Sequence, residues 1–315
     1  MSDPTSSVVP TPTYPTTPRV AFFVHAEWAM GAIHSGLVKE LYKRGIHANM
    51  LDWNKQYNRE EIESFVDLYD SIVTVPGNAI PILNTYGIPF EKMIGVFHGR
   101  YDIQSGLAHN NPFNKLKKVG AVSPDLVEFA HNHGIDCDIS VAKNGIHFDY
   151  FYQKPSQQLN TIGYGGALEY KNIYNNKIDL KRGYLVKEVS EKLRIPVNLV
   201  SPRHFLSMPT YYKGVDCVMV SSTEESCGLP LMEGAAAGRL PISTKVGVAR
   251  DYQNAPGVVV PMDEDKFVSS SVFKMSQLMF NNSKFHRMCV DAQEYARMHY
   301  DWSSRIDDWI KLLTE

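Results

Sequence analysis

The sequence has few cysteines and no long apolar run, and these absences exclude several classes of protein. The four cysteines among its 315 residues are scattered, with no C-x-x-C pair: Cys137, Cys217, Cys227 and Cys289. Such a distribution predicts reduced thiols in a cytoplasmic protein, and it argues against a disulfide framework or a zinc site. No apolar stretch approaches the roughly 18 residues that suggest a membrane span, so no membrane span is expected.

An excess of charge of one sign is also lacking. Lys and Arg number 32, Asp and Glu number 34, and the net charge is −2. The chain therefore has no global basic field that would favour nucleic acid or an anionic membrane. A nucleic acid partner stays possible, but the charge does not indicate one.

The first 18 residues differ from the rest of the chain. They hold five prolines among serines and threonines. They contain neither the basic region nor the apolar core of a signal peptide. This composition predicts a disordered lead-in.

From residue 19 onward, short apolar strands alternate with helical segments, which predicts parallel sheets covered by helices on both faces. The alternation restarts after a break at 155–158, so we expect two α/β units with a hinge near 150–158. Ligands bind such folds at the carboxyl ends of the strands. The strands expected in the first unit are 20–24, 46–51, 71–75, 93–97, 119–123 and 139–142. Those expected in the second are 161–164, 197–200, 215–220, 241–243 and 258–260.

Two carboxylates, Glu225 and Glu233, stand eight positions apart around a turn and the start of a predicted helix. Pro230 suits the first helical turn and Gly238 suits the C-terminal cap. We expect Glu225 in the loop before the helix and Glu233 on its first turn. A helix N-terminus binds phosphate and carboxylates accept hydrogen bonds from hydroxyl pairs, so together they suit a nucleotide-sugar. The alternative is a solvated loop glutamate and a glutamate that only complements the helix dipole.

The same stretch resembles the E-x7-E signature of the family 4 retaining glycosyltransferases of the GT-B superfamily. Further similar segments follow in the family's order: Val96–Gly99, Ala121–Ser123, Ala142–Phe151, Gly163–Asn172 and Asp301–Ser303. The chain departs from the pattern at two positions. His147 stands where the family usually has Asp, and Ala167 replaces a phosphate-binding Arg.

The resemblance implies an α/β protein of the GT-B fold. In that fold two Rossmann-like, doubly wound parallel-sheet domains face each other across a cleft, and the C-terminal helix crosses back to the first domain. The parts expected are a lead-in (1–18), an acceptor-side domain (19–152), a nucleotide-sugar domain (153–298) and the returning helix (299–315).

The resemblance also implies a retaining, metal-independent glycosyltransferase with no cofactor. Its donor would be a UDP- or GDP-sugar, and its acceptor a glycan, a lipid, a protein or a modified nucleobase. His98 would lie near the primary hydroxyl of the sugar, Lys171 would bind the diphosphate and Glu225 the sugar hydroxyls. Arg203 is the candidate replacement for the missing cation. The donor-binding residues would be Gly31, Gly166, Lys171, Arg203, Glu225, Cys227, Gly228, Leu229 and Glu233.

Other interpretations stay open. A GT-B epimerase or hydrolase would act on the nucleotide-sugar itself. A non-catalytic nucleotide-sugar binding module is compatible with the loss of the Arg at position 167. Individually, His98 could be a structural histidine, Gly31 a plain helix-start glycine, Cys227 a packed thiol and Lys171 a solvated lysine.

Overall fold

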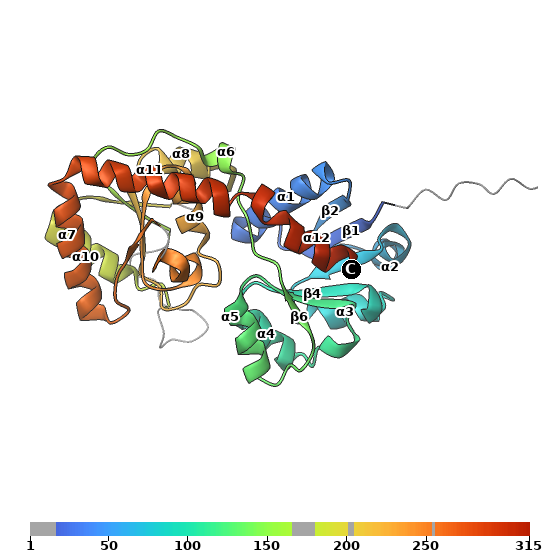
Figure 1. The fold of residues 1–315 in the computed structure, drawn as a ribbon. Coiled ribbons are helices and arrows are strands. Elements are labelled where there is room, and N and C mark those ends of the chain that lie inside the picture. Colours follow the sequence, from blue (N-terminus) through green and yellow to red (C-terminus); the bar gives the residue numbers. More distant parts are fainter. Residues whose placement is uncertain (1–16, 166–179, 201–204, 254–255) are drawn as a thin grey trace, which may run out of the picture.

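The computed structural model describes residues 17–165, 180–200, 205–253 and 256–315, which form two parallel sheets covered by helices (Figure 1). The first sheet has the order β2-β1-β3-β4-β5-β6 and every pair of neighbouring strands is parallel. Its strands are β1 (Arg19–Val24), β2 (His47–Asp52), β3 (Ser71–Thr74), β4 (Met93–Phe97), β5 (Lys118–Ala121) and β6 (Ile139–Val141).

The second sheet has the order β11-β10-β9-β7-β8 and is also parallel throughout. Apolar side chains of β9 are buried on both faces, as expected for a strand that lies between two layers of helices. The strands are β7 (Ile162–Tyr164), β8 (Val197–Leu199), β9 (Cys217–Val220), β10 (Leu240–Ser243) and β11 (Val258–Val259).

Helices follow almost every strand, and local signals in the sequence explain several of their ends. The Asn58 side chain accepts a hydrogen bond from the Glu61 amide and the Glu61 side chain accepts one from the Asn58 amide, a capping box that begins α2. Helices of the first unit are α1 (Trp28–Lys43), α2 (Arg59–Leu68), α3 (Ala79–Thr85), α4 (Arg100–Ala108) and α5 (Pro124–Asn132). The later helices are α6 (Phe148–Phe151), α7 (Gly183–Leu193), α8 (Met208–Tyr212), α9 (Leu229–Ala236), α10 (Glu264–Met279), α11 (Asn282–His299) and α12 (Ile306–Thr314). Short 3₁₀ turns join them, namely η1 (Phe90–Lys92), η2 (Phe113–Lys115), η3 (Phe205–Ser207), η4 (Gly247–Gln253) and η5 (Trp302–Ser304).

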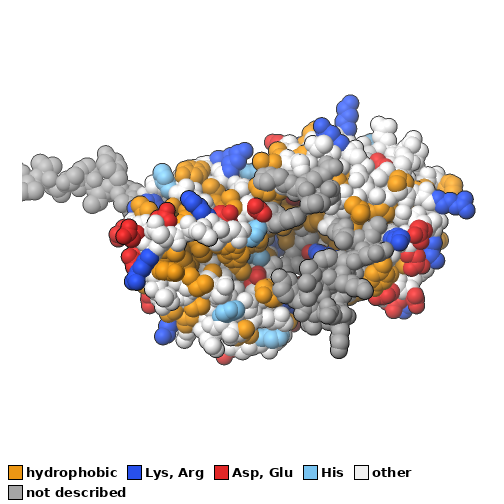
Figure 2. Space-filling view, turned by 180° about the vertical axis from the view of Figure 1, so that it is seen from behind, with side chains coloured by type: hydrophobic (Ala, Val, Ile, Leu, Met, Phe, Trp, Pro, Cys, Tyr) orange, Lys and Arg blue, Asp and Glu red, His pale blue; other side chains and the backbone are white. Residues whose placement is uncertain are grey.

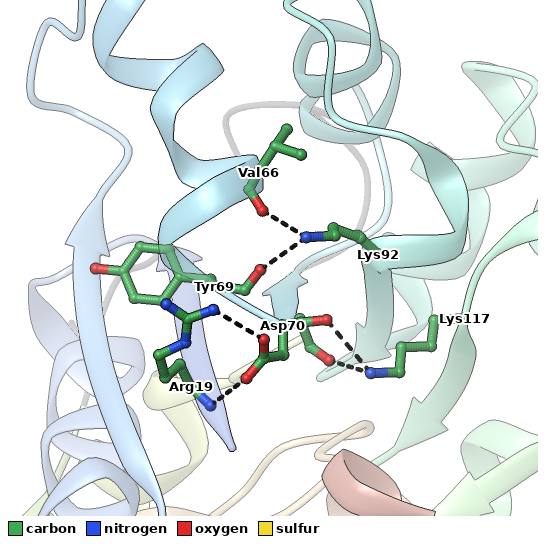
Figure 3. Close-up of polar contacts among 7 residues, drawn as sticks. Arg19, Val66, Tyr69, Asp70, Lys92 and Lys117 are labelled. Atoms are coloured by element: carbon green, nitrogen blue, oxygen red, sulfur yellow. Dashed lines mark hydrogen bonds and ion pairs between the residues drawn. The ribbon is translucent and has the colours of Figure 1, made fainter. Parts of the chain in front are cut away.

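Polar contacts fasten the amino ends of the strands in the first sheet, on the side away from their carboxyl ends (Figure 3). The Arg19 amide and guanidinium both donate to the Asp70 carboxylate, at 2.9 and 3.1 Å. Lys92 donates to the Tyr69 carbonyl at 3.1 Å, and Lys117 donates to the Ser71 hydroxyl at 2.5 Å. These contacts give Lys117 a structural role, within the basic run that precedes β5.

The C-terminal helix α12 leaves the second unit and packs against the first sheet (Figure 1). The Trp309 ring contacts Phe22 of β1 edge to face, with centroids 6.3 Å apart, and its indole N–H donates to the Lys143 carbonyl at 3.1 Å. Leu312 lies over Gly120 of β5, where a Cβ atom would come within 2.6 Å of the leucine side chain. The predicted return of the C-terminal helix to the first domain is therefore confirmed.

Removing the Trp309 side chain should destabilise the protein strongly, because this ring is fully buried. We expect Trp309→Ala to lower the free energy of unfolding by about 3–5 kcal/mol, measured by urea denaturation. Lys311→Ala on the same helix is the control, since its side chain is 72% exposed, and it should change stability by less than about 0.5 kcal/mol. Equal effects of the two substitutions would contradict the packing of α12.

The two units are joined by two passes of the chain that lie side by side. Ile146 and Asp301 form a parallel bridge, with the Ile146 amide donating to the Tyr300 carbonyl at 2.8 Å and the Trp302 amide to the Ile146 carbonyl at 2.9 Å. The Asp301 carboxylate also caps α6 by accepting from the Phe148 amide at 2.9 Å. Within the described residues, no helix is long and apolar enough to cross a membrane.

Candidate functional site

The strand order reverses at one point in each sheet, and these points locate the candidate site. In the second sheet β7 has β8 on one side and β9 on the other, so the chain leaves β7 and β9 in diverging directions at their carboxyl ends. Open parallel sheets bind ligands in the crevice formed there. The segment after β9 contains Glu225, and Gly165 follows β7 directly.

The loop between β9 and α9 is held by backbone hydrogen bonds, which fixes the position of the helix start. The Gly247 amide donates to the Glu225 carbonyl at 3.0 Å, and the Val248 amide donates to the Cys227 carbonyl at 2.9 Å. Gly228 caps α9 with a φ of +77°, in the left-handed region that favours glycine. Pro230 lies in the first turn and Gly238 follows the helix with a φ of +69°, both as predicted.

Glu225 lies in the loop before α9, as predicted, and is paired with a lysine. Its carboxylate accepts hydrogen bonds from the Ser222 hydroxyl at 2.9 Å and from the Lys181 ammonium. Lys181 precedes α7, and the next residue, Arg182, anchors this segment by donating to the Ser221 carbonyl at 2.7 Å. The structure therefore places a cation beside the carboxylate expected to hold the sugar.

Glu233 lies on the second turn of α9, because the helix begins at Leu229, so the predicted place on the first turn is wrong. Its side chain points into the interior and is 4% exposed. The Tyr212 hydroxyl donates to its carboxylate at 2.8 Å. Burial raises the pKa of Glu233 to about 7, and the hydrogen bond from Tyr212 opposes part of that rise.

A cavity of about 170 Å³ lies between the end of β7, α8, α9 and the first turns of α1, and we call it the β7–α9 cavity. Glu233 and Leu229 line it, and Gly165 keeps its entrance open beside Pro230, whose Cγ would lie 3.4 Å from a Cβ on that glycine. Most of the lining is apolar: Ala29, Ala32, Val200, Phe205, Met208, Tyr211 and Val218. An apolar slot with a carboxylate in its wall can accept a flat ring and a vicinal diol.

His98 follows β4 in the first unit. It therefore belongs to the side of the candidate site that faces the Glu225 loop of the second unit. Its ring is 5.2 Å from that of His34, and neither nitrogen of His98 has a hydrogen-bond partner among the described residues. Burial and the neighbouring His34 hold the pKa of His98 well below its usual value, so the ring is neutral at pH 7. Burial also lowers the pKa of His34, to about 4.

Contacts between the two units bring the His98 segment close to the Glu225 loop. Arg100, at the start of α4, forms an ion pair with Glu224 at 3.7 Å. A Cβ added to Gly99 would lie 3.9 Å from the Ser226 hydroxyl oxygen. The surface is hollowed between the two lobes in Figure 2, where charges of both signs are interspersed.

Two predicted donor-binding residues have structural reasons for their identity. A Cβ on Gly31 would lie 2.2 Å from the Ala26 carbonyl oxygen, so the first turn of α1 requires glycine there. Cys227 packs its sulfur 3.2 Å from that of Met232, and burial raises its pKa to about 11, as expected for a packed thiol. Three other predicted residues, Gly166, Lys171 and Arg203, lie outside the described residues, as does Ala167.

Sequence reasoning missed Lys181, Tyr212 and His34. Lys181 could have been considered, because it lies two residues before α7 and a cation near a helix N-terminus suits a phosphate site. Tyr212 lies 21 positions from Glu233, and no local spacing connects the two residues. His34 sits at an ordinary helical position, and only the fold places it beside His98.

Solved structures with the same arrangement identify the fold. HepE from Anabaena, solved in complex with UDP and glucose, superposes with a TM-score of 0.66 at 13% identity, over 95% of this chain and 100% of that one. The chain has the GT-B fold. Two other GT-B structures agree at similar coverage: the catalytic domain of starch synthase IV from Arabidopsis thaliana bound to ADP and acarbose (TM-score 0.67, 13% identity, 95% and 99% covered) and sucrose-phosphate synthase from Thermosynechococcus elongatus (0.65, 12%, 94% and 98%). No protein-family model and no curated protein matches the sequence.

For the nucleoside diphosphate ligand that is proposed below, the contact between Tyr212 and Glu233 predicts a pH-dependent effect on binding. Tyr212→Phe removes the hydrogen bond that lowers the pKa of Glu233, so the carboxyl group should ionise at a higher pH than in the wild type. We expect binding of a nucleoside diphosphate, measured by calorimetry, to weaken about 3- to 10-fold at pH 7 and to recover by pH 9. Tyr211→Phe is the control because its hydroxyl donates to the Asn198 carbonyl instead, at 3.0 Å. A loss of binding affinity in Tyr212→Phe that is the same at every pH would contradict this role of Tyr212.

Proposed function

We propose that this protein is a retaining, metal-independent glycosyltransferase that uses a nucleoside diphosphate sugar. The observation that carries the proposal is the placement of Glu225 and Glu233 on the two sides of the α9 N-terminus, with Lys181 beside the first and a ring-sized cavity beside the second. The glycosyltransferase structures with bound UDP or ADP support it through the shared fold.

These residues suit one orientation of the donor, with its base near Glu233 and its sugar near Glu225. The β7–α9 cavity receives the base and ribose, and Glu233 accepts hydrogen bonds from the ribose diol. At the start of α9, Pro230 has no N–H and the Leu231 amide donates to the Gly228 carbonyl at 2.9 Å, so the Leu229 amide and the helix dipole face the diphosphate, together with the Lys181 ammonium. Glu225 and His98, from opposite walls, hold the sugar hydroxyls.

This placement suits glycosyl transfer. The bond from the anomeric carbon to the diphosphate oxygen breaks, the anomeric carbon bonds to an acceptor hydroxyl oxygen, and the proton of that hydroxyl passes to the departing diphosphate oxygen. Negative charge develops on the departing diphosphate, where the helix N-terminus and Lys181 stabilise it. A cation and helix amides at that position provide the stabilisation that a metal provides in other enzymes, so we propose that no metal is required. UDP-, ADP- and GDP-hexoses are the donors to test first.

The proposal is tested by incubating the protein with these donors and measuring release of the nucleoside diphosphate with and without a panel of acceptor sugars, lipids and peptides. We expect acceptor-dependent release and a product with the anomeric configuration of the donor, by NMR. Release or epimerisation of the sugar without an acceptor would identify a hydrolase or an epimerase. Binding without turnover for every donor and acceptor would identify a binding module.

A further inference from the structure

A second cavity, of about 210 Å³, lies where α1, the connector between the units, η3 and α9 meet, and we call it the hinge cavity. Its walls are mostly apolar and include Ile33, Ile146, Phe151 and Trp302. It adjoins the β7–α9 cavity, with which it shares Ala32, Phe205, Leu229 and Glu233. The walls come from both α/β units, so a ligand here would contact both.

One end of the hinge cavity carries the Lys39 ammonium as the charged side chain that lines it, although Lys43, Glu40 and Asp301 also lie close enough to act on His147. Ser35 and Lys39 lie one turn apart on the same face of α1, and His147 reaches the same end from the connector. Lys39 has no hydrogen bond or ion pair with any described residue, whereas Lys43, one turn further, is paired with Glu40 at 2.7 Å. The Lys39 charge is close enough to His147 to help lower its pKa, after the larger effect of burial.

His147 is available for a ligand because another residue performs the local structural task. The amide of Phe148, which begins α6, is capped by the Asp301 carboxylate at 2.9 Å. The His147 side chain caps no helix, and its Nε2 atom is buried without a hydrogen-bond partner in the described structure. A buried ring nitrogen without a partner is costly unless a ligand or water satisfies it. The departure from the usual Asp at this position therefore leaves a donor beside Lys39.

The opposite end of the cavity has different chemistry. Glu233 lies at the boundary with the β7–α9 cavity, near Ala32, and Lys39 lies two helical turns from Ala32, or about 10 Å along the helix axis. The cavity thus runs from a cationic end through an apolar middle to the buried carboxyl group. An anionic group is favoured only at the end formed by Lys39, His147 and Ser35.

We propose that the hinge cavity binds a small organic anion, with a carboxylate or phosphate at Lys39 and His147 and an apolar body the size of one ring beside Trp302. The inference rests on the cavity and its charges, independently of the proposed transferase activity, so binding is measured without turnover.

The test uses 4-fluorobenzoate and phenyl phosphate as probes and 4-fluorobenzyl alcohol as the neutral counterpart. Binding is followed by ¹⁹F NMR for the fluorinated probes and, for all three, by the intrinsic tryptophan fluorescence, to which Trp302 in the cavity wall contributes. We expect at least one anion to bind at least tenfold more tightly than the alcohol, and the two anions together show whether the site favours carboxylate or phosphate. Lys39→Gln and His147→Asp should each weaken the binding of that anion about tenfold. Lys43→Gln should weaken it less than Lys39→Gln, because Lys43 acts on His147 but does not line the cavity.

Several results would overturn the proposal. These results are that neither anion binds, that the alcohol binds as tightly as the anions, or that Lys39→Gln binds the anion like the wild type. Complete displacement of the probe by a nucleoside diphosphate would also overturn it, because that result assigns the probe to the β7–α9 cavity. Lys39 is exposed, so its substitution should leave folding intact, and a thermal denaturation curve checks this for each variant.

Discussion

Glu225→Gln should lower kcat/KM for glycosyl transfer about tenfold to a hundredfold while leaving the binding of the free nucleoside diphosphate intact. The carboxylate is proposed to accept hydrogen bonds from the donor sugar, and a charged hydrogen bond is worth about 1.5–3 kcal/mol. Glutamine keeps the shape and one acceptor oxygen but loses the charge. It also releases Lys181 from its ion pair, so the diphosphate should bind no more weakly than in the wild type.

Glu224→Gln is the matched control for this prediction. Glu224 is the neighbouring carboxylate, but it pairs with Arg100 across the interface at 3.7 Å and does not contact Lys181. Its substitution should change kcat/KM less than threefold. Wild-type turnover in Glu225→Gln, or an equal loss in both variants, would remove Glu225 from the sugar site.

Glu233→Gln should weaken the binding of both the nucleoside diphosphate and its sugar about tenfold at pH 8, because the ribose diol loses a charged acceptor. The difference in binding affinity between Glu233→Gln and the wild type should be smaller at pH 6 than at pH 8. The pKa of Glu233 is about 7 in the free protein, so the wild-type carboxyl group is itself mostly protonated at pH 6. Calorimetric titrations at the two pH values measure the effect. A loss of equal size at both would argue against the carboxylate as the diol acceptor.

The same substitution should stabilise the protein at high pH. Burial raises the folded-state pKa of Glu233 from 4.5 to about 7, so the folded protein holds this proton more tightly than the unfolded chain. Ionisation of the buried Glu233 therefore destabilises the folded wild-type protein. This destabilisation is absent below pH 4.5, grows as the pH rises, and is complete above pH 7. At about 1.36 kcal/mol per pKa unit it amounts to about 3 kcal/mol.

Urea denaturation at pH 5 and pH 8 tests this expectation. Glu233→Gln should exceed the wild type in unfolding free energy at pH 8 by up to about 3 kcal/mol and by much less at pH 5. A difference that does not change with pH would show that the buried carboxyl group is not the cause. A variant that gains stability and loses nucleotide affinity would show that the glutamate is kept for binding.

Much of the fold could be predicted from the sequence because the strands are short apolar runs between clear helix signals. The expected strand at 71–75 is β3 and the one at 93–97 is β4, each within one residue at its ends. These features depend on local residue types, which a single sequence contains.

The sequence predicted the loop of the candidate site, but it predicted only partly how the two carboxylates are buried and paired. Gly228 and Pro230 fixed the turn before α9, but the helix begins at Leu229, so Glu233 is its fifth residue, just past the first turn, and is buried. The hydrogen-bond partners of the two carboxylates come from segments distant in the sequence. Lys181 lies 44 positions from Glu225, and Tyr212 lies 21 positions from Glu233. Contacts of this kind depend on tertiary packing, and no local pattern encodes them.

The division of labour between the two carboxylates can be tested by one calorimetric comparison at pH 8. Wild type, Glu225→Gln and Glu233→Gln are each titrated with UDP and UDP-glucose, or with the ADP pair if that base binds more tightly. The account predicts that Glu225→Gln binds the nucleoside diphosphate like the wild type but loses the additional affinity due to the sugar, whereas Glu233→Gln loses affinity for both ligands. Equal weakening of the nucleoside diphosphate by the two substitutions, or no weakening by either, would contradict it.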